Sequence, residues 1–145
     1  MSVELYETKW WSLDIPEEWD VELEEDVTVI SDEDGVSEIG ISTLIKAEGE
    51  TDDDDVDAFT VDLTEQGIVG EDGKCGDYHA TVFEYSEDGF ACRDWFVCCG
   101  PILILISYAC DEQNKGMDDV AINEILSSLR LYPEAKDEDD EDQEE

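Results

Sequence analysis

The side chains with the most chemistry to offer in this chain are five cysteines and one histidine. The cysteines stand at positions 75, 92, 98, 99 and 110, and the histidine is His79. A zinc site needs four ligands, which usually come as closely spaced Cys pairs with further Cys or His residues. The sequence contains no C-x-x-C pair, so the spacing predicts no metal site.

Three of the cysteines frame an apolar run, FVCCGPILILISYAC, at residues 96–110. Two strands joined by a turn at Gly100-Pro101 would account for this run. Adjacent strand residues point to opposite faces of a sheet, so Cys98 and Cys99 cannot chelate one ion together. Free cysteine usually packs as a small hydrophobic residue, and we expect all five thiols to be buried and unreactive.

The length of this turn decides how Cys92 and Cys110 are related. A two-residue turn sets Cys110 opposite Ala91 and places Cys92 and Cys110 on opposite faces of the sheet. A three-residue turn places the two cysteines on one face. The residues alone leave both registers open.

Clusters of acidic residues make calcium a second candidate ligand. They occur in the segments SDEDG (31–35) and GEDGKCGD (70–77) and in the run 52–55. An EF-hand loop needs an acidic first residue, Gly at the sixth position and Glu at the twelfth. Placing Gly35 sixth makes Ile30 the first residue, and placing Gly89 sixth makes Trp95 the twelfth. We therefore expect these acids to cap and solvate the chain, with loose divalent-ion binding as the alternative.

The sequence carries no recognisable catalytic motif. It lacks GxSxG, P-loop and GxGxxG patterns, and Cys–His chemistry would have to join His79 to Cys75, its nearest cysteine in sequence. An ordinary strand histidine accounts better for His79. Because there are 44 acidic residues, no pair of carboxylates stands out. We predict a protein that is not an enzyme and that holds no cofactor and no metal.

Net charge is the most extreme property of the chain: 44 acidic and 7 basic residues give a formal charge of −37. Residues 134–145, EAKDEDDEDQEE, carry nine acids and one lysine, a net charge of −8, and are predicted to be a disordered tail. Residues 1–133 carry the remaining −29. Such a field attracts basic proteins and repels phosphate and anionic lipid, so we expect a basic protein partner, no nucleic acid and no membrane. Adaptation to high salt explains the same acidity equally well.

Length and patterning predict one domain at residues 1–133, followed by the tail. A chain of 145 residues suits a single hydrophobic core. The first twenty residues contain acids throughout and no apolar run typical of a secretory leader. No segment reaches the roughly 18 apolar residues of a membrane span, so we expect a cytoplasmic protein.

Strand and helix patterns alternate along the chain. Strands are predicted at residues 10–16, 27–31, 37–45, 78–85, 90–99 and 102–110, and helices at 51–67 and 117–133. Residues 102–110 are apolar on both faces, which is typical of a central strand covered on both sides. We predict an α+β fold in which an antiparallel sheet of about six strands packs with two helices as an α/β/α-like sandwich.

Trp10, Arg93 and Trp95 are the candidate protein-binding residues. Trp10 alternates onto the strand face opposite Trp11, and Trp95 shares a face with Arg93. Aromatic residues beside arginine are typical interface anchors. Both tryptophans could instead lie beneath the helices as core residues, and the sequence leaves this alternative open.

Five stretches between residues 10 and 131 carry a resemblance to a known family through their order along the chain: WWSLDIPEEW, VTVIS, IGISTLI, RDWFVCCGPILILISY and EILSSLRL. Their order resembles the layout of the PsbP-like superfamily, which includes Mog-type Ran-binding proteins and DcrB-like proteins. The resemblance implies an α+β fold and a non-catalytic role, since its members bind a GTPase, assist a photosystem or act as chaperones for secreted effectors.

Charge and resemblance together predict a small acidic protein-binding domain that serves as an accessory, chaperone or immunity-like partner of a basic protein. Two alternatives stay open: a module that responds to divalent cations or thiol chemistry, and an ordinary soluble protein of a halophile. The identity of the partner and the oligomeric state are not determined by the residues.

Overall fold

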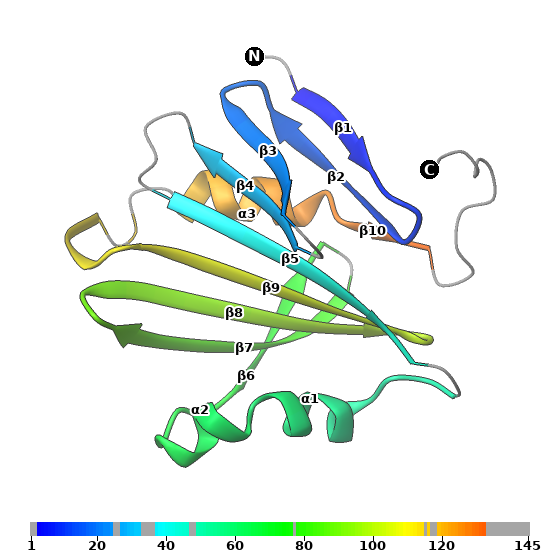
Figure 1. Ribbon diagram of the computed structural model, residues 1–145, viewed down its shortest axis with the longest axis vertical. Coiled ribbons are helices and arrows are strands. Elements are labelled where there is room, and N and C mark those ends of the chain that lie inside the picture. The colour runs from blue at the N-terminus through cyan, green and yellow to red at the C-terminus, as the bar shows by residue number, and fades with distance from the viewer. Residues whose placement is uncertain are drawn as a thin grey trace.

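Seven strands form one antiparallel sheet through the middle of the molecule (Figure 1). The computed structural model describes residues 3–24, 27–32, 37–46, 49–76, 78–114, 116 and 119–132. In sheet order the strands are β3 (Trp19–Glu24), β4 (Val27–Asp32), β5 (Ser37–Ile45), β9 (Ile102–Asp111), β8 (Phe90–Cys99), β7 (Tyr78–Glu87) and β6 (Glu71–Cys75). Strand β9 lies in the centre, as its apolar pattern on both faces predicts.

A second, smaller sheet contains β1 (Val3–Glu7), β2 (Trp11–Pro16) and β10 (Arg130–Leu131), with β2 in the middle. The sequence placed residues 10–16 in the same sheet as the other predicted strands, and this placement is wrong. The physical reason is that Trp11, Leu13 and Ile15 are buried in the main core, so β2 packs across the large sheet instead of joining its edge. The Trp11 Nε1–H also donates a hydrogen bond to Thr43 Oγ1 of β5 at 2.9 Å.

Strands β1, β3, β6 and β10 have no counterpart among the predicted elements. β1 and β6 are largely exposed and show no clear apolar period. β3 does alternate apolar and acidic residues, a strand period that the sequence-based assignment missed; Trp19 at its start is buried, whereas Leu23 is exposed. β10 falls within the predicted helix 117–133, of which the structure forms α3 (Asp119–Ser127). Residues 117, 118 and 133 of that prediction and the predicted tail at 134–145 lie outside the described residues.

The predicted helix at 51–67 consists of two short helices, α1 (Asp53–Phe59) and α2 (Val61–Glu65). Thr60 separates them, because its backbone leaves helical geometry at φ −111° and ψ 14°. Its hydroxyl donates to the carbonyl of Val56 at 2.9 Å. Side-chain bonding of this kind competes with the helical ladder and explains why one apolar stripe yields two helices. A 3₁₀ turn, η1 (Glu112–Asn114), follows β9.

Local signals define both ends of this helical pair. Asp52 caps α1 by accepting from the backbone N–H of Asp55, and the Asp55 carboxylate accepts in return from the Asp52 N–H, which forms a capping box. Gly67, with φ of 86°, ends α2, and its N–H and that of Ile68 donate to carbonyls of the last turn. This is a Schellman motif and confirms the predicted stop at Gly67.

The hairpin between β8 and β9 has the two-residue turn. Cys99 pairs with Ile102, and Cys110 pairs with Ala91. Gly100 has φ of 56°, while proline at the second turn position fixes a negative φ, and this combination is that of a type II′ turn. Because directly paired residues share a face, Cys92 and Cys110 lie on opposite faces of the sheet.

Different elements cover the two faces of the large sheet. We call the side that carries Ile39, Trp95 and Ile106 the inner face; α3 and the buried side of β2 pack against it. We call the other side the outer face; there α1 and α2 pack on Phe83, Phe96 and neighbouring side chains. Figure 1 shows α3 with the small sheet on one side of the large sheet and α1 with α2 on the other. The predicted α+β fold is confirmed, with more strands and shorter helices than expected.

We predict that Ile106→Ala lowers the free energy of unfolding by about 3 kcal/mol, because it leaves a cavity in the middle of the inner face. Ile106 is 0% exposed and pairs with Ile41 and Trp95 on the neighbouring strands. Urea unfolding followed by tryptophan fluorescence measures the change. Leu23→Ala serves as the control: Leu23 is 69% exposed, so it should change stability by less than about 0.5 kcal/mol. Equal losses in the two variants would contradict this view of the core.

Candidate binding surfaces

The helices α1 and α2 leave part of the outer face uncovered. Their contacts involve Phe83, Phe96 and Leu103, which belong to β7, β8 and β9. The pairing registers place another set of side chains on the same outer face, over β3, β4, β5 and the far part of β9. We call this set the open face: Asp20, Glu22, Glu24, Val27, Val29, Ser31, Glu38, Gly40, Ser42, Ser107 and Ala109.

The open face combines a floor of small side chains with an acidic margin. The floor residues, which are Val, Ser, Gly and Ala, are all partly exposed. Asp20, Glu22 and Glu24 project from the edge strand β3 and are exposed, as is Glu38 on β5. No residue of β3, β4, β5 or β9 is Lys or Arg. The surface therefore offers apolar contact and negative charge without an internal counter-charge.

The nearest cation in sequence, Lys46, follows β5 directly and is engaged elsewhere. Its ammonium group binds Asp55 Oδ2 at 3.1 Å and donates to the carbonyl of Glu50 at 3.2 Å. The hydrogen bond to Asp55 raises the pKa of Lys46. Lys46 thus belongs to the N-terminal end of α1, and it does not neutralise the acids on β3.

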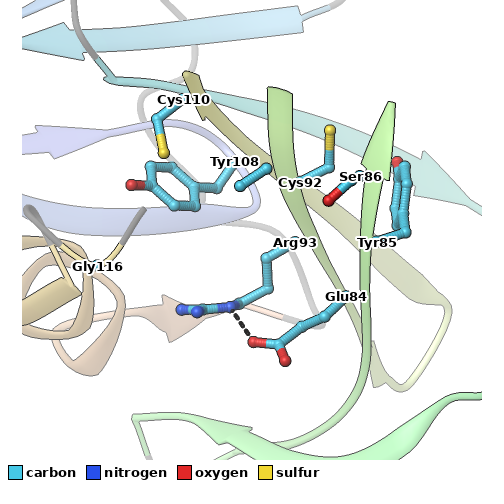
Figure 2. A pocket seen from close by; sticks show the side chains of 9 residues that line it. Glu84, Tyr85, Ser86, Cys92, Arg93, Tyr108, Cys110 and Gly116 are labelled. Atoms are coloured by element: carbon cyan, nitrogen blue, oxygen red, sulfur yellow. Dashed lines mark hydrogen bonds and ion pairs between the residues drawn. The ribbon is translucent and has the colours of Figure 1, made fainter. Parts of the chain in front are cut away.

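A pocket of about 260 Å³ opens on the inner side, at the end of β7, β8 and β9 (Figure 2). Arg93 points into it and its Nε–H donates to Glu84 Oε2 at 2.7 Å. The guanidinium also lies 5.6 Å from the centre of the Trp95 ring. Tyr108 and Cys110 form part of the wall. A single arginine that is already paired with a carboxylate leaves little net positive charge for an anionic ligand.

The structure separates the three predicted protein-binding residues. Trp95 is 5% exposed and belongs to the core, which was the second of the two alternatives for this residue. The Arg93 side chain is 18% exposed and reaches the surface at the pocket. Trp10 precedes β2 in the small sheet, is partly buried and lies 5.6 Å from the Lys9 ammonium. Arg93 and Trp95 are therefore in contact with each other, whereas no described contact joins Trp10 to them.

Asp94 is a buried carboxylate that the sequence did not single out among 44 acids. It is 8% exposed on the outer face of β8, and its Oδ2 accepts a hydrogen bond from the Tyr85 hydroxyl at 3.0 Å. Burial raises the pKa of Asp94, although the hydrogen bonds from Tyr85 and Ser107 oppose that shift. The one available signal was its position beside Trp95 and Phe96 in a strongly apolar strand.

None of the five cysteines forms a disulfide, and burial disfavours reaction of three of them. Cys75 is buried, which raises its pKa to about 12. Burial also raises the pKa of Cys92 and of Cys99, both of which are partly exposed. The thiolate is the reactive form, so these groups are poor nucleophiles at neutral pH. Within the described part of the chain no group of three or more His, Cys, Asp or Glu residues is arranged to hold a metal ion.

The prediction that all five thiols are buried holds in part. Cys75 and Cys110 are buried, whereas Cys92, Cys98 and Cys99 are partly exposed. The difference follows from position, because the latter three lie on β8 near the margins of the covered areas. None of the helices in the described residues is long and apolar enough to cross a membrane.

Comparison with known proteins identifies solved structures of similar fold. No protein-family model matches the chain, and no curated protein matches its sequence. The solution structure of cyanobacterial PsbP (CyanoP) from Synechocystis sp. PCC 6803 aligns with a TM-score of 0.66 and 16% identity, over 90% of this chain and 93% of that one. A crystal structure from Bacteroides thetaiotaomicron VPI-5482 aligns with a TM-score of 0.61 and 20% identity, over 86% of this chain. The chain spans only 46% of the length of the Bacteroides protein.

We predict that Asp94→Asn becomes progressively more stable than wild type as the pH rises above 3.8, the ordinary pKa of an aspartate. The folded protein holds the Asp94 proton more tightly than the unfolded chain, so ionisation of Asp94 lowers the free energy of unfolding as the pH passes from 3.8 through the raised pKa. Asparagine does not ionise. Urea unfolding of both proteins between about pH 4 and 8 measures the difference, in which the other carboxylates cancel. A difference independent of pH would contradict the burial argument.

We also predict that Cys75 and Cys110 do not react with Ellman's reagent in the native protein near pH 8, because both are buried. All five thiols should react once the protein is unfolded. Cys75→Ala should leave the native count unchanged and lower the unfolded count by one. Rapid native reaction of Cys75 would instead support a thiol-responsive module.

Proposed function

Because this chain has a PsbP-like fold and an acidic sheet face without cations, we propose that it is a non-catalytic protein-binding domain with a basic partner. It would act as an accessory factor, chaperone or immunity-like protein in the cytoplasm. Five cysteines without a disulfide suit a reducing compartment. The acidity disfavours partners that present phosphate or anionic lipid, namely nucleic acids and membrane surfaces.

The observation that carries this proposal is the composition of the open face. Three exposed acids on β3, Asp20, Glu22 and Glu24, border a floor of small, partly exposed side chains, and a fourth, Glu38, lies between Ser31 and Ala109 within it. The strands of this face contain no Lys or Arg. Charged groups on an interface steer association and select partners of opposite sign. Apolar area inside a charged margin is the usual anatomy of a protein interface.

The remaining surface supports the same proposal. Two of the described cations are already paired with carboxylates, Lys46 with Asp55 and Arg93 with Glu84. The formal charge of −37 reflects 44 carboxylates that greatly outnumber the 7 cations. Such a field raises the association rate with a basic protein, and this effect declines as the Debye length falls from about 10 Å at 0.1 M salt to about 3 Å at 1 M.

We predict that the immobilised protein retains a basic protein from a native lysate at about 50 mM salt and releases it steadily as the salt concentration rises. The control is a resin that carries polyglutamate at the same charge density, which captures whatever binds to negative charge alone. A partner retained by the protein and not by polyglutamate supports the proposal. If the two resins retain the same proteins at every ionic strength, or if retention is indifferent to salt, the proposal is wrong.

A further inference from the structure

We infer that the open face docks a basic amphipathic helix of the partner, and that this helix extends the layer formed by α1 and α2. The inference rests on the proposed function and adds the place of binding and the form of the bound segment. Three observations carry it: incomplete helical cover, the shape of the floor and the spacing of the acids.

Helical cover of the outer face stops partway across the sheet. In layered domains a sheet with apolar residues on both faces is normally covered on both. α1 and α2 cover Phe83, Phe96 and Leu103 on β7 to β9, but their described core contacts include no residue of β3, β4 or β5. Val27 and Val29 consequently remain partly exposed. A further helix beside α1 and α2 would cover them.

The floor of the open face is shaped for close approach. Gly40 lies in the middle of β5 with Val29 directly opposite, yet it does not have the positive φ that would require glycine. Among the described residues, a Cβ atom built at Gly40 would come within 4 Å of Val27 Cγ1 alone, at 3.4 Å, which is a van der Waals contact. Glycine weakens a strand interior and often marks a place where another molecule approaches the backbone. Fold packing therefore does not explain Gly40, whereas a docked segment does.

The acids on β3 recur at a spacing that a helix can match. Asp20, Glu22 and Glu24 alternate along one side of the strand, roughly 6.6 Å apart at about 3.3 Å per residue. Helix residues at positions i, i+4 and i+8 recur roughly every 6 Å along the axis. Lys or Arg at these positions would each meet one carboxylate, while the adjacent apolar stripe of the helix rests on the floor.

Other occupants fit this surface less well. A second copy of the chain would bring one acidic margin against another, because a twofold interface pairs each patch with itself. A strand added to the free edge of β3 would satisfy backbone groups but leave Val27, Val29 and Gly40 uncovered. A helix accounts for both the floor and the margin.

The test uses a synthetic amphipathic peptide of about 18 residues, with Lys at i, i+4 and i+8 beside an Ala/Leu stripe. A scrambled peptide of the same composition is the control. Binding to the full-length protein at about 50 mM salt is measured by fluorescence anisotropy, and amide chemical shifts locate the site. We expect the amphipathic peptide to bind more tightly and to shift the amides of β3, β4, β5 and β9. Equal binding of the scrambled peptide, or shifts confined to the edge of β3 or to the Arg93 pocket, would overturn the inference.

Two triple variants of equal charge separate the local site from the general field. D20N/E22Q/E24Q removes the margin of the open face, whereas D57N/D62N/E65Q removes three exposed acids from α1 and α2. If each lost ion pair contributes about 0.5 kcal/mol, the first variant weakens the peptide about tenfold, and the second should weaken it less than about twofold. If both variants lose the same amount of peptide affinity, the peptide binds to the overall negative charge of the protein, and the proposed docking site is wrong.

Gly40→Thr provides a test that does not change charge. Threonine favours strands, so the melting temperature should stay the same or rise, while the side chain blocks the floor and weakens peptide binding at least about fivefold. Ser86→Thr, at an exposed position of β7, is the matched control and should leave binding unchanged. Unaltered binding to Gly40→Thr would show that the floor is not used.

Failure of this inference can be told apart from failure of the proposed function. If both triple variants capture a salt-sensitive basic partner equally well, the proposed function is supported and the proposed docking site is wrong. If the wild-type protein captures no basic partner, the proposed function falls.

Discussion

Strand β9 needs apolar cover on both faces, and the rest of the architecture is arranged to supply it. Ile104 and Ile106 face α3 and the small sheet, while Leu103 faces α1 and α2. Burying two faces of one strand requires two further layers, one on each side of the sheet. On the outer side, the described core contacts of α1 and α2 reach β7, β8 and β9 and include no residue of β3, β4 or β5. The open face is the direct consequence.

The two-residue turn at Gly100-Pro101 determines what each face of β8 contributes. Its register sends Arg93 and Trp95 inward, where Trp95 joins the core and Arg93 meets Glu84. It sends Asp94 outward, into the margin of the area that α1 and α2 cover. A turn longer by one residue would exchange these roles. The same register places the Cys92 and Cys110 thiols on opposite faces of the sheet.

Acidity and fold make separate contributions to the proposed function. The PsbP-like fold is shared with proteins of 16 to 20% identity, so it establishes an architecture and no particular role. The effect of the charge depends on its position: on β3 the carboxylates border a partly exposed floor of small side chains, whereas around α1 they cap a helix and bind Lys46. Carboxylates around α1 thus serve local structure, whereas those on β3 are the ones to which the proposed function assigns recognition.

The sequence by itself determined the central strand, the helix stop at Gly67 and the α+β class, because these follow from local periodicity and backbone chemistry. It limited the hairpin at Gly100-Pro101 to two pairing registers, one for a two-residue turn and one for a three-residue turn. Only the tertiary structure decided that Trp95 is buried, that β2 forms a separate sheet and that β3 borders an open face with Gly40 in its floor. Such features depend on which surfaces remain uncovered after all elements have packed. A local pattern of residues does not specify which surfaces those are, because they depend on contacts between segments far apart in the sequence.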